Sequence, residues 1–310
     1  MRKIIDGLKE NAWIYYWCIR IPFLFKYEIP GRLLPDSYFV KKKFKEKFGF
    51  DLNLKNPKRL TEKMQYLKLN DRKDVYTMYA DKWQVREFLS SRYGEEYLVP
   101  ILFHTERISG ITPENINTFP CVIKASTGCG TYKMLFDGED INWPKLRALA
   151  KTWIKNNHYW KSQEWQYKNT PQHFLVEKLM TSKDGSLPND YKLFYIEGKL
   201  MFVHVGVNND PNGKYKIEYD ANWKPLPFSW ERRKTSGAYQ RGKEIPKPAS
   251  FDKMKEIGDD IAKMFHQVRV DFYDVDGKLY YGEITLCHGS GLNKFIPDEY
   301  DEMFGKELNL

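Results

Sequence analysis

The chain has 310 residues, a formal net charge of +9 and four cysteines. That length suggests about two domains of about 150 residues each, and a hydrophobic content of 42% excludes a disordered chain. The positive charge indicates an anionic partner, such as nucleic acid, phosphate-bearing ligands or the cytoplasmic face of a membrane. Nucleic acid is disfavoured, because the sequence has neither zinc-finger spacing nor an aromatic-basic run typical of RNA-binding sheets.

The cysteines favour a reducing compartment. Cys18, Cys121, Cys129 and Cys287 form neither a Cys-x-x-Cys pair nor a zinc-type pattern. We therefore expect free thiols in a cytoplasmic protein.

The segment 12–26 is rich in aromatic residues. Arg20 and Pro22 interrupt it and no small-residue cleavage site follows, so we expect neither a signal peptide nor a membrane-spanning helix. Two interpretations stay open. The segment is either a helix packed on the body of the protein or a helix lying in a membrane interface, for which aromatic rings beside Lys and Arg are typical.

Helical patterns follow. The basic run 41–47 places phenylalanines at helical spacing. Thr61 is the expected N-cap of the next helix. A longer helix is then expected after Asp71, running through Tyr79 and Asp81 to Tyr93, where Gly94 ends it.

A short β-rich run, 119–123, ends at Lys124 and enters a loop of small residues that contains Ser126, Gly128 and Gly130. Glycines let backbone N–H groups approach phosphate oxygens closely, and a lysine at the strand end supplies a point charge. The loop is not a Walker A motif, since the lysine precedes the glycines. An ordinary β-turn explains the pattern equally well.

Two further strand regions carry charges. The run 174–180 is an apolar strand that contains the pair Glu177-Lys178, and 190–203 is a hairpin that turns at Glu197-Gly198. Lys192 faces the same way as Phe194 in that hairpin, which is an unusual place for a charge without a partner. Residues 208–250 are expected to form a long loop.

The stretch 268–285 predicts a hairpin around an Asp/Gly turn. With the turn centred near Gly277, Asp271 lies opposite Glu283 and Arg269 lies opposite Thr285, with Tyr281 on the same side as Glu283. Two facing carboxylates suit Mg²⁺, which takes one or two carboxylates plus phosphate oxygens. The alternative is a surface hairpin with one polar face.

The order of four motifs along the chain resembles the ATP-grasp superfamily. These motifs are the lysine before the glycine loop, the strand with Glu-Lys, the hairpin with a lysine and the Asp/Glu hairpin. Over residues 33–296 the chain is similar to the TupA-like ATP-grasp family, named for teichuronopeptide biosynthesis. The stretches that carry this likeness are Asn56-Pro57 to Glu62-Lys63, Leu67-Lys68-Leu69, Asp81-Lys82-Trp83-Gln84-Val85-Arg86, Arg269-Val270-Asp271 and Gly282-Glu283-Ile284-Thr285.

The resemblance implies an α+β fold of two subdomains whose antiparallel sheets sandwich ATP and Mg²⁺ (or Mn²⁺), with a helical N-terminal extension. We expect a helical region over 1–75, a subdomain with the phosphate-covering loop over 76–187, and a subdomain with the metal site over 188–310. The implied activity joins a carboxylate to an amine through an acyl phosphate.

The resemblance also implies roles for single residues. Lys124 and Lys192 would bind phosphate, the loop from Ser126 through Gly128 and Gly130 to Thr131 would cover it, and Asp190 would contact ribose or substrate. Glu177, Lys178 and Leu179 would hold adenine, and Asp271 and Glu283 would bind the metal. Arg269 would stabilise the acyl phosphate, an electrostatic role worth about 3–4 kcal/mol in other enzymes. His288, Ser290 and Gly291 would approach the acceptor substrate.

One residue departs from the family pattern. Thr285 stands where many ATP-grasp ligases have Asn, so we expect it near substrate and leave open whether one or two metal ions bind.

The family context implies a substrate in surface-polysaccharide or capsule synthesis. The expected reaction joins an amino acid or amine to a uronic acid on an anionic glycan, or on its nucleotide-linked or lipid-linked precursor, at the inner face of the membrane; a peptidyl carboxylate of a peptidoglycan-like polymer is the other expected acceptor. Three other functions stay open: a sugar or polymer kinase, which would use the same lysines and metal, a glycosyltransferase, for which Asp274-Val275-Asp276 has the Asp-x-Asp pattern, and a non-catalytic glycan-binding or membrane-binding protein.

Overall fold

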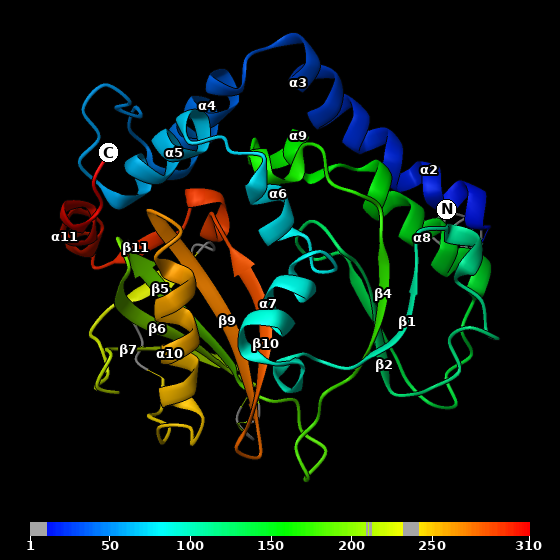
Figure 1. Ribbon diagram of the computed structural model, residues 1–310. Helices are drawn as coiled ribbons and strands as arrows, with labels where there is room; N and C mark the ends of the chain where they lie inside the picture. The colour runs from blue at the N-terminus through cyan, green and yellow to red at the C-terminus, as the bar shows by residue number, and fades with distance from the viewer. Residues whose placement is uncertain (1–10, 209, 211–212, 232–241) are drawn as a thin grey trace. The chain divides into compact units, whose positions relative to one another are not determined.

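The computed structural model describes residues 11–208, 210, 213–231 and 242–310 (Figure 1). The chain forms two compact units, each built from three separate stretches. Unit 1 comprises Met1–Phe39, Lys73–Glu87 and Val99–Leu179, and unit 2 comprises Val40–Arg72, Phe88–Leu98 and Met180–Leu310. The expected division into three continuous parts, with boundaries after residues 75 and 187, stays a prediction.

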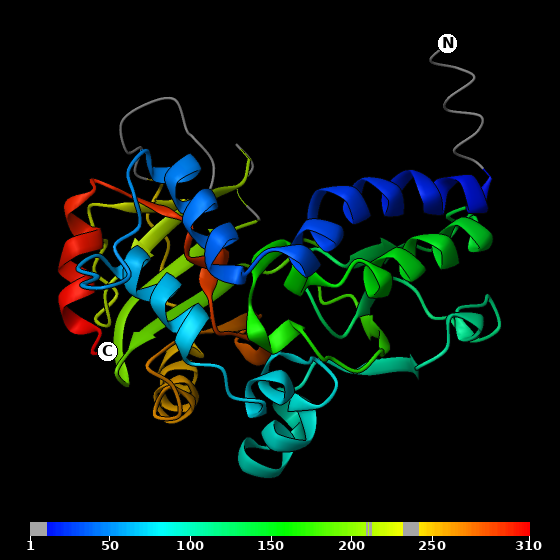
Figure 2. The same cartoon turned by 90° about the horizontal axis from the view of Figure 1, so that it is seen from above.

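Unit 1 begins with a continuous helical segment. Helix α2 (Ala12–Phe23) starts at Asn11, whose side chain accepts a hydrogen bond from the Trp13 amide. It runs through Pro22 into a π-helical turn, η1 (Leu24–Glu28), and then into α3 (Ile29–Leu33). Helix α2 lies beside α8 (Trp143–Lys155), as Figures 1 and 2 both show. In the described part of the chain, no helix is both long enough and apolar enough to cross a membrane.

The sheet of unit 1 has four antiparallel strands in the order β1-β4-β2-β3. The strands are β1 (Ile101–Thr105), β2 (Cys121–Ala125), β3 (Tyr132–Leu135) and β4 (Phe174–Lys178). One face is apolar because alternate residues of β2, such as Cys121 and Ile123, point to it, and α8 covers that face with Leu146. The short helices of this unit are α6 (Val75–Ala80), η3 (Ile108–Gly110), α9 (His158–Ser162) and η4 (Trp165–Tyr167).

The prediction of one continuous helix after Asp71, through Tyr79 to Tyr93, is wrong. The chain forms α6 and α7 (Val85–Tyr93) instead. Asp81 takes an extended conformation between them, and its Oδ1 accepts hydrogen bonds from the amides of Trp83 and Gln84 at 2.9 and 3.0 Å. A carboxylate that binds nearby backbone N–H groups competes with the helix, which explains the break.

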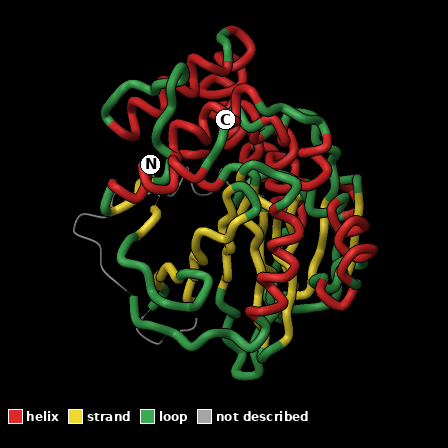
Figure 3. Tube along the Cα trace, turned by 60° about the vertical axis from the view of Figure 1, so that its left-hand side comes forward, coloured by secondary structure: helices red, strands yellow, loops and turns green. Residues whose placement is uncertain are grey.

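The sheet of unit 2 has five antiparallel strands in the order β10-β9-β5-β6-β7. The strands are β5 (Asp190–Ile196), β6 (Lys199–Val207), β7 (Tyr215–Tyr219), β9 (Gln267–Val275) and β10 (Lys278–Thr285), drawn in yellow with the other strands in Figure 3. Helix α10 (Phe251–Ala262) packs on this sheet with its buried Met254, Ile257 and Ile261. Sheets with α-helices on their faces confirm the predicted α+β class.

The loop expected over 208–250 is only partly a loop. It contains β7 and β8 (Ser229–Glu231), and β8 pairs with β11 (Lys294–Ile296) in a separate two-stranded sheet. Residues 209, 211–212 and 232–241 of this stretch lie outside the described residues. Strands β7 and β8 were not predicted because Asn, Gly and Pro on either side of them give the whole stretch a loop-like composition.

An aromatic core lies at one end of unit 2. Phe194 and Phe202 from the large sheet meet Trp230 of β8, and helices α5 (Leu60–Asn70) and α11 (Glu299–Glu307) close the core with Met64 and Phe304. The remaining helical elements of the described chain are α4 (Asp36–Phe48), η2 (Glu95–Tyr97) and η5 (His288–Gly291).

Thr61 is not the N-cap that the sequence predicted, since α5 starts one residue earlier with Arg59 as its cap. Instead, the buried Thr61 donates its Oγ1 hydrogen to Asp301 Oδ2 at 2.6 Å, and its amide donates to Asp301 Oδ1 at 2.9 Å. Thr61 therefore connects α5 to α11 rather than starting a helix.

Replacing Thr61 by Val should lower the free energy of unfolding by about 1–3 kcal/mol, because it leaves one oxygen of a buried carboxylate without its donor. Burial raises the pKa of Asp301 to about 6, so the loss should be larger near pH 8, where the carboxylate is ionised, than near pH 5. Urea unfolding at both pH values measures it. Thr61→Ser keeps the hydroxyl and is the control; an equal loss in both variants would mean that the methyl group, not the hydrogen bond, matters.

Candidate active site

The hairpin of β9 and β10 has the predicted register. Asp271 is the partner of Glu283, and Arg269 is the partner of Thr285. A two-residue turn at Asp276 and Gly277, both with positive φ, closes the hairpin.

A β-bulge at Gly282 produces this register. Val275 pairs with Lys278, so an uninterrupted ladder would set Asp271 opposite Gly282. The extra residue shifts the partner to Glu283. The bulge also corrects one prediction: Tyr281 pairs with Phe272 and leaves the side of Glu283, because the bulge reverses the alternation of side chains.

A row of charged and polar side chains crosses the sheet of unit 2. One residue from each strand contributes, in the partner order Glu283, Asp271, Lys192, His204 and Glu218. Lys192 lies 3.1 Å from Asp190 Oδ2, and His204 Nδ1 lies 2.9 Å from Glu218 Oε1. The lysine that looked unpartnered in the sequence therefore has an acid on its own strand and another across the ladder.

Arg269 holds the acids of this row. Its guanidinium donates to both oxygens of Asp271 at 2.6 Å, and Nη2 also donates to Glu283 Oε1 at 3.1 Å and to Thr285 Oγ1 at 3.0 Å. Its Nη1 contacts His288 Nδ1. Only 7% of Arg269 is exposed, so these charge-assisted bonds act in a region with little water.

Burial and neighbouring charges shift pKa values here. Burial raises the pKa of Asp271, while Arg269 and Lys192 act in the opposite direction. Burial, and then Arg269, hold the pKa of His288 well below its usual value, so its imidazole is neutral at pH 7. Cations therefore stabilise the ionised form of Asp271.

The residues present fit a magnesium ion whose coordination shell is completed by phosphate oxygens and water. In the described part of the chain, no group of three or more His, Cys, Asp or Glu side chains forms a metal site by itself. Asp271 and Glu283 supply two facing carboxylates, and Mg²⁺ usually binds one or two carboxylates together with substrate phosphates and water. These two acids would hold the ion.

The segment after β10 is fixed from α5. Ser290 and Gly291 both have positive φ. Lys68 Nζ donates to the carbonyl oxygen of Ser290 at 2.7 Å and contacts its Oγ at 3.0 Å, and Gln65 Nε2 donates to the carbonyl oxygens of Ser290 and Gly291 at 3.0 and 2.8 Å. These contacts were not predictable from local patterns, because Lys68 and Ser290 lie far apart along the chain.

In unit 1, Lys124 lies in β2, and its Nζ is 2.6 Å from Glu177 Oε2 in the neighbouring β4. Arg86 Nη1 lies 4.0 Å from Glu177 Oε1. Glu177 therefore lies between two cations, which holds the lysine side chain in place.

The glycine loop follows β2, with positive φ at Gly128 and Gly130. Ser126 is buried and donates its Oγ hydrogen to Asp81 Oδ2 at 2.9 Å, and Lys82 Nζ donates to the Gly128 carbonyl at 3.4 Å. The hydroxyl of Ser126 thus anchors the base of the loop. Asp81 and Lys82 belong to a stretch that carries the family likeness, but no pattern in the sequence predicts that they contact this loop.

The end of β4 uses its amides within unit 1. The Lys178 amide donates to Pro100 O at 3.0 Å, and the Leu179 amide donates to Pro120 O at 3.2 Å. An adenine base at this position would therefore have to form its hydrogen bonds with groups other than these two N–H groups. The structure thus brings the predicted site residues together in two groups, one within each unit.

A lysine before a glycine loop on one antiparallel sheet and an arginine-held pair of acids on another, within an α+β chain, define the ATP-grasp class of proteins. More narrowly, the chain belongs to the TupA-like ATP-grasp family, because the family described as TupA-like ATPgrasp matches residues 62–309. The predicted family and fold are confirmed.

Comparison with curated proteins gives no match. Similar solved structures include the ATP-grasp ligase PsnB complexed with minimal precursor, at 11% identity over 73% of this chain and 60% of that chain with a TM-score of 0.39. The D-alanine–D-alanine ligase from Bacillus anthracis has 17% identity over 67% of this chain and 57% of that chain, with a TM-score of 0.37. The enzyme from Coxiella burnetii has 12% identity over 80% and 60%, with a TM-score of 0.39. The chain thus spans less than two thirds of the length of each.

Replacing Gly282 by Ala should lower the free energy of unfolding by about 1–3 kcal/mol, because the added carbon would lie 3.0 Å from the backbone oxygen of Asp271. Urea unfolding measures the loss. Gly206→Ala in β6 is the matched control, since its added carbon would meet Asp190 at an ordinary 3.5 Å. Similar stability of the two variants would show that the bulge tolerates a side chain.

Proposed function

We propose that the protein is an ATP-dependent ligase that joins a carboxylate to an amine. Family membership supports this proposal, and one observation carries it: Arg269 binds Asp271 and Glu283 beside a row that continues to Lys192. Phosphoryl transfer needs cations around oxygens that gain negative charge, and the arrangement supplies them in a buried setting.

The reaction has two steps. A carboxylate oxygen attacks the γ-phosphorus of ATP, so that an acyl phosphate forms and ADP leaves. The amine nitrogen then attacks the acyl carbon, phosphate leaves, and the nitrogen loses a proton. The products are the amide, ADP and phosphate.

Each unit would contribute its own groups. In unit 1, Lys124 would contact phosphate oxygens, and the backbone N–H groups of the loop from Gly128 to Gly130 would cover them. In unit 2, Asp271 and Glu283 would hold Mg²⁺, which supplies charge neutralisation for the phosphates when bound. Arg269 and Lys192 would stabilise charge on the transferring group.

Asp190, Thr285 and the segment from His288 through Ser290 to Gly291 remain proposed nucleotide or substrate contacts. Glu177, Lys178 and Leu179 remain the proposed adenine hinge, with Glu177 also holding Lys124.

The structure argues against the glycosyltransferase alternative. Asp274 accepts hydrogen bonds from the amides of Ser250 and Gly277, and Asp276 accepts one from the Lys183 amide at 2.9 Å. Both carboxylates therefore stabilise the turn and its surroundings, as Asp residues in turns commonly do.

We further propose that the carboxylate belongs to a uronic acid of a cell-surface polysaccharide or its precursor, and that the enzyme works at the cytoplasmic face of the membrane. The net charge of +9 suits an anionic glycan and an anionic lipid surface.

The N-terminal helices support the membrane contact. Large apolar side chains recur every four residues along α2, η1 and α3, and most are exposed: Trp13 71%, Ile21 46%, Phe25 70%, Ile29 41% and Leu33 77%. A spacing of four advances by about 40° per step around an α-helix of about 3.6 residues per turn, and the wider π turn offsets part of this drift. The side chains therefore form an apolar stripe that winds slowly around the helical segment.

Charges beside this stripe are basic. Glu28 is the one acid between residues 11 and 34, and it is buried between Arg20 and Arg32 at 2.5 and 3.0 Å. Helix α8, which lies beside α2, has four basic residues and no acid. An apolar stripe with basic neighbours fits a helix that lies in the interface of an anionic bilayer.

The protein should sediment with vesicles that contain anionic phosphatidylglycerol, and less with neutral phosphatidylcholine vesicles. Replacing both Phe25 and Leu33 by Ala should weaken binding about tenfold or more, since it removes two large apolar groups from the stripe. Phe136→Ala removes a ring that is 50% exposed elsewhere in unit 1 and is the control. Equal sedimentation of all three proteins would contradict the membrane contact, and a dimer that the double variant abolishes would assign the stripe to a second copy.

Pure protein with ATP, Mg²⁺, uronic acids and amino acids should release ADP and phosphate together with an amide. Glu283→Gln should reduce turnover by about 100-fold or more, because even residues that only support a metal ligand typically cost 10–100-fold. Glu307→Gln, an exposed residue of α11, is the matched control. A phosphorylated sugar without free phosphate would identify a kinase, unchanged ATP would contradict both, and full activity of the Glu283→Gln variant would remove Glu283 from the metal site.

A further inference from the structure

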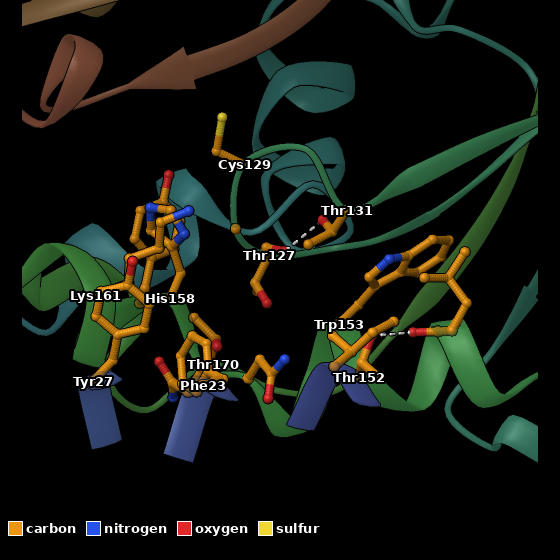
Figure 4. A pocket seen from close by; sticks show the side chains of 16 residues that line it. Phe23, Tyr27, Thr127, Cys129, Thr131, Thr152, Trp153, His158, Lys161 and Thr170 are labelled. Atoms are coloured by element: carbon orange, nitrogen blue, oxygen red, sulfur yellow. Dashed lines mark hydrogen bonds between the residues drawn. The ribbon is translucent and has the colours of Figure 1, made fainter. Parts of the chain in front are cut away.

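A pocket of about 270 Å³ lies within unit 1, and neither Lys124 nor Glu177 lines it (Figure 4). Three parts of the chain form its walls. The N-terminal helices contribute Phe23 and Tyr27, the glycine loop contributes Thr127, and helices α8 and α9 contribute Trp153 and Lys161.

The wall from the N-terminal helices lies outside residues 62–309, the region that the family match covers. The pocket is therefore a feature of this chain rather than of the matched region alone. The phosphate-covering loop is the part of the proposed active site that lines it, through Thr127, Gly128, Cys129 and Thr131.

The lining suits a hydroxyl-rich anion. The pocket has 16 lining residues with no Asp or Glu among them, and Lys161 carries a positive charge. The acid nearest to the lining in the ion pairs of this region is the buried Glu164, whose Oε1 lies 3.9 Å from His158 Nε2. Aromatic rings, Tyr27 on one side and Trp153 on the other in Figure 4, offer flat apolar faces. Aromatic faces, hydrogen-bonding groups and a lysine match a sugar ring that bears a carboxylate.

Asn156 adds an oriented donor. Arg20 Nη1 donates to Asn156 Oδ1 at 3.0 Å, which fixes the amide. The two hydrogens of its Nδ2 have no partner among the described residues, and an amide nitrogen can only donate. Sugar hydroxyls and carboxylates are suitable acceptors.

The pocket shares the glycine loop with the proposed phosphate site. Thr127, Gly128 and Thr131 line it, and a carbon added to Gly128 would lie 3.6 Å from the Cβ of His158 in α9. The base of the loop is anchored separately through Ser126 and Asp81. A ligand in the pocket would therefore contact the part of the loop beyond its anchor.

We propose that this pocket binds a sugar acid of the glycan and that its occupancy holds the glycine loop in place. The ligand class rests on the proposed function, since a polymer of uronic acids would present a second such sugar beside the reacting one. The pocket would then recognise the polymer and fix the phosphate-covering loop in the same event.

Binding is tested on the full chain without ATP by isothermal titration calorimetry. Glucuronate and galacturonate should bind, and glucose and galactose should bind at least about tenfold more weakly, because the charge-assisted contact is lost. Lys161→Gln should weaken uronate binding by about tenfold or more and leave neutral sugars unchanged. Lys155→Gln removes an exposed lysine of α8 that does not line the pocket, and should bind like the unmodified protein.

Three outcomes overturn the binding proposal: no uronate binding, equal binding by the Lys161 and Lys155 variants, or inorganic phosphate binding more tightly than uronate. Since the titration needs neither ATP nor turnover, these outcomes are separate from failure of the ligase assay. If the protein is an active ligase but binds no uronate at this pocket, the binding proposal alone is contradicted and the proposed ligase activity stands.

The loop part is tested through Cys129, which lies on the glycine loop and is exposed. Cys18 is the other exposed cysteine of the described chain, and Cys121 and Cys287 are buried, so a Cys18→Ser protein reports on Cys129. Saturating glucuronate should slow its reaction with a thiol reagent several-fold, and Lys161→Gln should remove this protection. If uronate binds but the rate at which Cys129 reacts with the thiol reagent does not change, the proposal that the ligand holds the glycine loop in place is overturned.

Discussion

The ion pair of Arg269 and Asp271 is the interaction on which the unit 2 site depends. Both side chains are nearly buried, and the guanidinium meets both carboxylate oxygens. Removing one member of such a pair typically costs about 3–5 kcal/mol, because the remaining charge stays buried without compensation. The pair also sets the position of Glu283, Thr285 and His288, which all contact the same guanidinium. The positions of four side chains therefore follow from that of Arg269, on the second strand of the sheet.

Alternation along the strands separates the two roles of this sheet. One face is apolar, carries Val268, Val270 and Phe272, and packs under α10. The other face carries the charged row and, toward one end, the aromatic core around Phe194 and Phe202. Charges are thus placed beside a rigid apolar cluster, where water is scarce and each ionic contact is stronger than it would be in solvent. The site is fixed by regular secondary structure rather than by loops.

Local patterns predicted much of this arrangement. Period-two alternation and the Asp/Gly turn were enough to set Asp271 against Glu283, because both act within one hairpin. The bulge at Gly282 was not predictable, since it shifts the ladder by one residue, and the register was right only because the assumed turn centre included that shift. The long-range contacts of Asp81, Thr61 and Lys68 were missed for a shared reason. Their partners, Ser126, Asp301 and Ser290, lie far away along the chain, and only folding brings such groups together.

The N-terminal helices are joined to α9 at several points, with Tyr159 Oη donating to Asp36 Oδ2 at 2.6 Å and Arg32 stacked 5.1 Å above the ring of Trp160. Gly31 fits closely against that same ring. None of these three contacts involves Lys124, Arg269, Asp271 or Glu283. A lineage could therefore exchange or reshape its first forty or so residues and so change one wall of the pocket in unit 1, while the ATP-grasp residues in the rest of the chain stayed as they were.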